Sequence, residues 1–115
     1  MFTDKTSYHI QQFQPRPAAL ALKLINDLRA EGIPAYISSG VRTVAEQREL
    51  VRKGASRTMQ SKHIEGRAFD IDILGYGRDE LPRWFWDLIG QYGESLGLKW
   101  GGRFKGFYDG AHFET

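Results

Sequence analysis

The sequence contains no cysteine among its 115 residues. This absence excludes disulfide bonds, thiolate nucleophiles and thiolate metal ligands together, so a bound metal has to be held by histidine, aspartate or glutamate. The sequence also lacks an apolar run long enough to cross a bilayer, and its N-terminal stretch has no basic segment followed by an apolar one. We therefore expect a protein made in the cytoplasm without a signal peptide and not inserted into a membrane.

The sequence has little excess charge of either sign. Sixteen basic residues face fourteen acidic ones, which leaves a net charge of +2, and the basic residues form no run. This balance argues against a nucleic-acid partner. Apolar residues make up 41% of the chain, which is enough for one modest core. We expect a single domain over residues 1–115 and a monomer.

Hydrophobic periodicity and turn residues predict a mixed chain of helices and short strands. Helices are expected over residues 17–31, 44–53 and 80–96, and strands over 33–37, 68–73 and 111–114. Thr43 and Glu46 form a T-x-x-E capping box at the start of the second helix. Asp79 is expected to cap the third helix.

The strand over residues 68–73 has strict alternation of apolar and other side chains. Phe69, Ile71 and Ile73 point to the core, whereas Asp70 and Asp72 share the opposite face with Ala68. One side of this strand is therefore predicted to carry two carboxylates.

The residues suited to metal chemistry are His63, Asp70 and His112. A catalytic zinc ion takes three such ligands and leaves a fourth position for water. Asp109 lies three residues before His112 with a glycine between them, so it is a candidate general base. A single histidine or aspartate in a small domain is more often a surface or structurally paired residue. Spacing alone leaves both interpretations open.

Three sequence blocks resemble a known family. The segment SKHIEGRAFD (residues 61–70) fits the pattern S-x-H-x-x-G-x-A-x-D. A second block is the segment SGVR (39–42) with the following Glu46 and Gln47. A third block consists of the segments WGG (100–102) and DGAHFE (109–114). Together they resemble the VanY-like D-Ala-D-Ala carboxypeptidase and L-alanyl-D-glutamate endopeptidase family of zinc peptidases, peptidase family M15. The resemblance covers residues 17–114.

This resemblance implies a zinc ion held by His63, Asp70 and His112, with Asp109 as the catalytic acid and base. It also implies that Arg42 binds the substrate or stabilises the oxyanion. The implied fold is α+β, with a small antiparallel sheet flanked by helices, as in hedgehog and DD-peptidase domains. Val41 stands where the family commonly has an aromatic residue, and an aspartate base is more like the phage endolysin branch.

The implied activity is zinc-dependent hydrolysis of the peptidoglycan stem peptide. An L-alanyl-D-glutamate endopeptidase of the endolysin type, acting on the cell wall after release during phage or prophage lysis, is the first hypothesis. A D-alanyl-D-alanine carboxypeptidase is the close alternative. A non-catalytic zinc-binding module of the same fold is a third, and a zinc-free domain with a coincidental motif is a fourth.

Three polar residues near these motifs have two interpretations each. Ser61 either hydrogen-bonds to substrate or caps the loop ahead of His63. Asp72 supports the site or forms a surface salt bridge. Glu114 holds a ligand histidine in one tautomer or is a plain strand-end carboxylate.

Histidine and tryptophan residues outside the motif of residues 61–70 have simpler expectations. His9 is expected to be a surface residue. Trp84 and Trp86 are expected to be core or partly buried residues of the third helix. Trp100 borders the site loop, with core packing as its default role.

Overall fold

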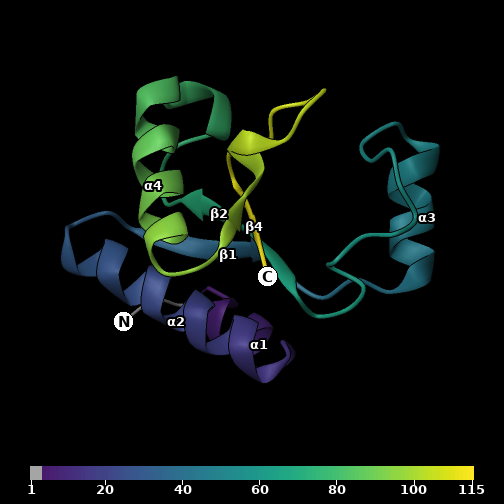
Figure 1. The fold of residues 1–115 in the computed structure, drawn as a ribbon, viewed down its shortest axis with the longest axis horizontal. Helices are drawn as coiled ribbons and strands as arrows, with labels where there is room; N and C mark the ends of the chain where they lie inside the picture. Colours follow the sequence, from purple (N-terminus) through teal and green to yellow (C-terminus); the bar gives the residue numbers. More distant parts are fainter. Residues whose placement is uncertain (1–3) are drawn as a thin grey trace.

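The structure, a computed structural model, describes residues 4–115 (Figure 1). These residues contain the strands β1 (Ala35–Ser39), β2 (Ala68–Ile73), β3 (Lys99–Trp100) and β4 (His112–Glu114). The four strands form one antiparallel sheet in the order β1-β2-β4-β3. The register of β2 against β4 places Asp70 opposite His112. Two of the predicted ligand residues are therefore paired neighbours on central strands.

Within residues 4–115, four α-helices and two short 3₁₀ turns accompany the sheet, which confirms the predicted α+β arrangement. The helices are α1 (Thr6–Gln11), α2 (Pro15–Ala30), α3 (Val44–Arg52) and α4 (Arg83–Ser95), and the turns are η1 (Arg78–Glu80) and η2 (Gly101–Arg103). In Figure 1, α2 and α4 lie close to the strands, whereas α3 stands apart on the right. None of the helices in residues 4–115 is both long and apolar enough to span a membrane.

The sheet has an apolar face, which forms the core as the alternation in β2 predicted. Phe69, Ile71 and Ile73 are buried and belong to one cluster with buried side chains of α2 and α4. The Phe69 ring stacks on that of Phe113 with 5.8 Å between centroids. Gly93 of α4 lies over Phe113 so closely that a β-carbon there would stand 2.5 Å from the ring. This glycine, unfavourable for a helix by itself, permits α4 to approach the sheet.

The predicted third helix begins later than expected, and Asp79 does not cap it. Residues 78–80 form η1, Leu81 is extended, and Pro82 is the N-cap of α4. Proline disfavours a helical conformation in the residue before it, so the helix cannot run through Leu81. Trp84 on this helix is 67% exposed, contrary to the prediction, whereas Trp86 is buried.

The second predicted helix is confirmed with its cap. Both hydrogen bonds of the capping box are present, from the Glu46 backbone N–H to Thr43 Oγ1 and from the Thr43 N–H to Glu46 Oε1, each 3.0 Å long. The first predicted strand is displaced by two residues, to Ala35–Ser39. Helix α1 was not predicted. It joins the sheet through Thr6, whose buried Oγ1 accepts a 2.9 Å hydrogen bond from the Ile37 N–H.

Candidate active site

Three predicted ligand side chains converge on one point beside the polar face of the sheet. His63 comes from the loop before β2, Asp70 from β2 and His112 from β4. Asp70 Oδ1 lies 3.1 Å from His112 Nδ1 and 3.4 Å from His63 Nε2. The two ring nitrogens are 3.2 Å apart. All three residues are buried, with exposed fractions of 2% to 7%.

Each histidine has an outer ring nitrogen, which points away from the cluster, and an inner one, which faces it. The hydrogen bond of the outer nitrogen determines whether the inner one carries a proton. His63 Nδ1 is 2.9 Å from the Gly40 carbonyl oxygen, and His112 Nε2 is 2.8 Å from Glu114 Oε1. A carbonyl and a carboxylate only accept hydrogen bonds, so each outer nitrogen carries the proton of a neutral ring. The inner nitrogens then present lone pairs to each other and to Asp70. Three converging lone pairs fit a cation, and one ligand atom from each residue lies within 4.8 Å of the others.

The ionisable groups of this cluster shift one another's pKa values. Burial opposes the charge of Asp70, yet hydrogen bonds from His112 and His63 hold its pKa well below the ordinary value. Burial also disfavours a charged His112, but the carboxylates of Asp70 and Glu114 outweigh it and raise the pKa of this ring to about 9. The raised pKa favours an additional proton on the inner nitrogen of His112, and a metal ion bound by the three residues would take the place of this proton.

Arg42 contacts the second oxygen of the ligand carboxylate. Its guanidinium lies 3.4 Å from Asp70 Oδ2 and donates a 3.0 Å hydrogen bond to Gln47 Oε1. Gln47 is fully buried and donates from Nε2 to Ser56 Oγ and the Thr58 carbonyl. Gln47 belongs to one of the three sequence blocks, where no role was predicted for it. Its amide joins α3, the following loop and the arginine.

Ser61 and Glu114 each hydrogen-bond to a histidine of the cluster. Ser61 Oγ accepts a 3.2 Å hydrogen bond from the His63 backbone N–H, which agrees with the loop-capping interpretation. Glu114 accepts the hydrogen bond from His112 described above and lies 3.4 Å from the Lys62 ammonium. The interpretation of Glu114 as a carboxylate that orients a histidine thus agrees with the geometry.

Asp109 is held near the cluster by the Trp-Gly-Gly segment. The Trp100 indole N–H donates a 2.8 Å hydrogen bond to the Gly110 carbonyl, and the Asp109 N–H donates one of 3.1 Å to the Gly101 carbonyl. A β-carbon on Gly101 would collide with the Asp109 backbone, so only glycine fits there. Burial and the nearby Asp70 charge raise the pKa of Asp109 despite opposing attraction from His112. A carboxylate in this state is a better base than an exposed one.

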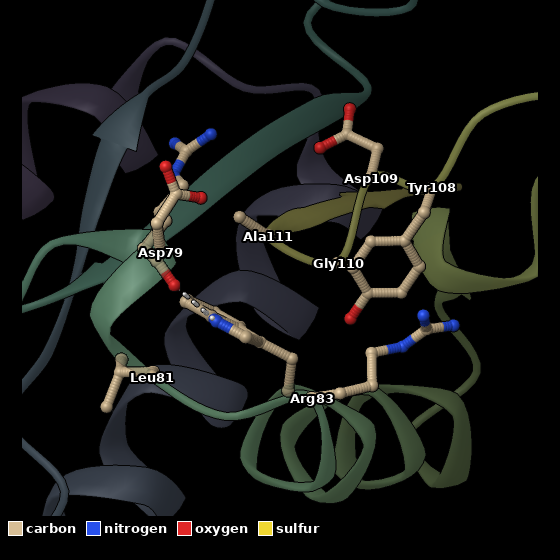
Figure 2. Close-up of a pocket in the computed structure, with 9 residues that line it drawn as sticks. Asp79, Leu81, Arg83, Tyr108, Asp109, Gly110 and Ala111 are labelled. Carbon is tan, nitrogen blue, oxygen red and sulfur yellow. Dashed lines mark hydrogen bonds between the residues drawn. The ribbon is translucent and has the colours of Figure 1, made fainter.

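A cavity of about 440 Å³ opens beside Asp109 (Figure 2). It is lined by Tyr108, Asp109 and Gly110 of the loop before β4, by Arg78 of η1 and by Arg83 of α4. Asp72 accepts two hydrogen bonds from Arg78, of 2.7 and 3.0 Å, so the salt-bridge interpretation of Asp72 agrees with the structure. The sequence carried no signal for this cavity, because its walls come from η1, α4 and the loop before β4.

The prediction for His9 was wrong. Its ring packs against Gly40, and its Nδ1 is buried without a hydrogen-bond partner in the described part of the chain. Burial lowers the pKa of His9, which favours the neutral ring. No pattern in residues 1–16 indicated this contact, because it joins α1 to a loop far along the sequence.

Comparisons of the sequence with known proteins find similar chains. Residues 54–115 match the sequence profile of a family described as D-alanyl-D-alanine carboxypeptidase. The L-alanyl-D-glutamate peptidase of Listeria phage A118 is 30% identical over 121 residues, which cover 98% of this chain. This chain spans only 41% of the length of that phage protein.

Solved structures show the same fold. The crystal structure of the Serratia marcescens L-Ala D-Glu endopeptidase ChiX superimposes with a TM-score of 0.78 at 28% identity, covering 98% of this chain and 87% of that one. The vancomycin resistance D,D-pentapeptidase VanY in complex with Zn(II) gives a TM-score of 0.66 at 17% identity, covering 89% of this chain and 71% of that one. The second likeness shows the fold alone.

Proposed function

Because this chain belongs to peptidase family M15, whose metal is zinc, we propose that it hydrolyses a peptide bond in the stem peptide of peptidoglycan. The three converging lone pairs of His63, Asp70 and His112 carry this proposal. These residues would hold the zinc ion. A zinc ion bound there would act as a Lewis acid, which lowers the pKa of water and polarises the scissile carbonyl.

Asp109 is the proposed acid and base. Its carboxylate takes the proton of the attacking water and delivers it to the leaving amine. Its raised pKa suits both tasks, and the bonds of Trp100 and Gly101 to its loop hold it in place. A purely structural metal site needs no general base. The buried Asp109 carboxylate, with its raised pKa, therefore argues against a non-catalytic zinc-binding module.

Arg42 has two proposed tasks. Its contact with Asp70 Oδ2 fixes the orientation of the ligand carboxylate. Its remaining N–H donors provide a fixed positive charge for substrate binding or for the oxyanion, as proposed from the sequence. Ser61 Oγ accepts a hydrogen bond from the His63 backbone N–H, which supports a role in the loop, and its O–H group can still donate to the substrate.

The bond between L-alanine and D-glutamate is the proposed site of cleavage. Both the phage relative and ChiX carry this specificity in their names. Release of free D-alanine from a stem-peptide terminus is the second candidate, because the matched family is described as a D-alanyl-D-alanine carboxypeptidase. The phage relative supports action on the cell wall during lysis. A single domain over residues 1–115 and a monomeric state stay predictions.

Digestion of purified peptidoglycan by the zinc-loaded protein tests the proposal, with mass analysis of the fragments. New amino termini on D-glutamate are expected, and Asp109→Asn should reduce their formation by about 10² or more. Free D-alanine as the product would instead establish the carboxypeptidase. A zinc-loaded protein that releases neither would leave the non-catalytic module as the better explanation.

A further inference from the structure

The cavity beside Asp109 has one wall that suits a negatively charged group. Four charged residues line it: Arg78, Asp79, Arg83 and Asp109. In Figure 2, Asp79 lies on the side opposite Tyr108, and Arg83 lies beneath the Tyr108 ring. The two aspartates repel an anion, so the cavity offers an anion site only around its arginines.

Arg78 is not available for this task. Its Nε and Nη2 donate hydrogen bonds to the two carboxylate oxygens of Asp72, and Nη2 also lies 3.3 Å from Ser38 Oγ. A bidentate pair of this kind has its charge compensated and its geometry fixed. Arg78 is therefore a part of the wall, with its charge already matched.

Arg83 is available. Its side chain is 64% exposed, and its contact with Asp87 is a single long one, from Nε to Oδ1 at 3.4 Å. The guanidinium carbon lies 3.7 Å from the centroid of the Tyr108 ring, so the aromatic face holds the charged group in place. A guanidinium has five N–H donors, and these contacts leave some of them for a ligand. Tyr108 directly precedes Asp109, so this charge stands next to the proposed base.

We infer that Arg83, held by Tyr108, binds the free carboxylate of the D-glutamate residue that flanks the scissile bond. This inference rests on the proposed endopeptidase activity. D-glutamate has two carboxyl groups, and only one of them can join the next residue, so the other remains charged. A peptide whose scissile bond lies at Asp109 would present this carboxylate within the adjoining cavity, where Arg83 has one contact of 3.4 Å with a carboxylate and Arg78 has two shorter ones. Arg83 is thus a specificity-determining residue.

Cleavage of two synthetic peptides tests this assignment. Both are L-Ala-D-Glu-L-Lys tripeptides; one keeps the free D-glutamate carboxylate and the other has a carboxamide in its place. The zinc-loaded protein should prefer the carboxylate by about ten-fold in kcat/KM, mainly through KM, as expected for a partly exposed charge-assisted hydrogen bond. Arg83→Gln should abolish this preference by slowing only the carboxylate peptide, and Arg83→Lys should keep part of it.

Arg103→Gln is the matched control. Arg103 is 62% exposed, pairs with Glu94 of α4 and lies 5.3 Å from the Trp100 ring, but it does not line the cavity. This variant should keep the full preference. An Arg83→Gln protein with the wild-type preference would overturn the assignment. So would a wild-type protein that cleaves both peptides equally, or one whose preference follows amidation of the peptide's C-terminal carboxylate instead.

Calorimetric binding to an Asp109→Asn background separates this inference from the proposed function. In this background, binding of the two peptides should differ by the same factor, and addition of Arg83→Gln should remove the difference. If the active protein cleaves no peptide, the proposed function fails. If the peptides bind the Asp109→Asn protein equally, the Arg83 assignment fails even where cleavage persists.

Discussion

The ring of His9 lies against Gly40 so closely that a β-carbon on Gly40 would stand 2.6 Å from His9 Nδ1. The carbonyl of the same Gly40 accepts the hydrogen bond from His63 Nδ1. A short N-terminal helix thereby supports the residue that sets the tautomer of a proposed zinc ligand.

Gly40→Ala is expected to displace this loop. The clash should cost about 1–3 kcal/mol of stability, and the misplaced carbonyl should lower zinc affinity by about ten-fold or more. Thermal unfolding and competition with a chromophoric chelator measure the two effects. His9→Ala in the same chain should restore much of both, because it vacates the space that the new methyl group needs. Absence of rescue would show that the ring contact is not the cause.

Glu114→Ala should weaken zinc binding with little change in fold. The carboxylate orients His112 through a 2.8 Å hydrogen bond, and loss of such a partner commonly costs about 10- to 100-fold in metal affinity. Chelator competition is again the measurement. Glu94→Ala removes a half-buried carboxylate that pairs with Arg103 and should leave zinc affinity unchanged. Equal affinities in the two variants would contradict an orienting role for Glu114.

Gln47→Ala should destabilise the protein by about 1–3 kcal/mol, because it removes the partner of buried polar groups. The lost contacts are those with Arg42, Ser56 and the Thr58 carbonyl. Urea unfolding measures the change. Gln91→Ala, at an exposed position of α4, is the control and should stay within about 0.5 kcal/mol of the wild type.

Asp4→Asn should reduce stability at neutral pH but not in acid. Burial alone would raise the pKa of Asp4, but the Thr6 N–H hydrogen bond and Arg29 lower it below the ordinary value of 3.8. A lowered folded-state pKa means that the ionised carboxylate stabilises the fold above pH 3.8, and that this contribution disappears as the pH falls through the folded-state value. Melting temperatures of both proteins, measured over a range of pH, should therefore draw together as the pH falls below 3.8. Parallel curves would contradict the assignment.

Local patterns in the sequence predicted the elements whose causes are local. The alternation of β2 and the capping box of α3 appear where expected, because neighbouring residues determine them. The ligand set was one of several possibilities until the family resemblance selected it. Helix α1 and the role of His9 were missed, because their contacts are with Ile37 and Gly40, far along the chain. Trp84 was misplaced because α4 buries the face that carries Trp86 and Ile89, and Trp84, two residues before Trp86, lies on the other side of the helix.

The pairing of Asp70 with His112 across β2 and β4 also has a consequence for biosynthesis. One ligand lies near the middle of the chain and its partner 42 residues later, so the full set cannot meet until the ribosome has released β4. The proposed metal site would therefore be complete only after β4 has been synthesised and has paired with β2. A nascent chain that stops before β4 would lack one of the three side chains.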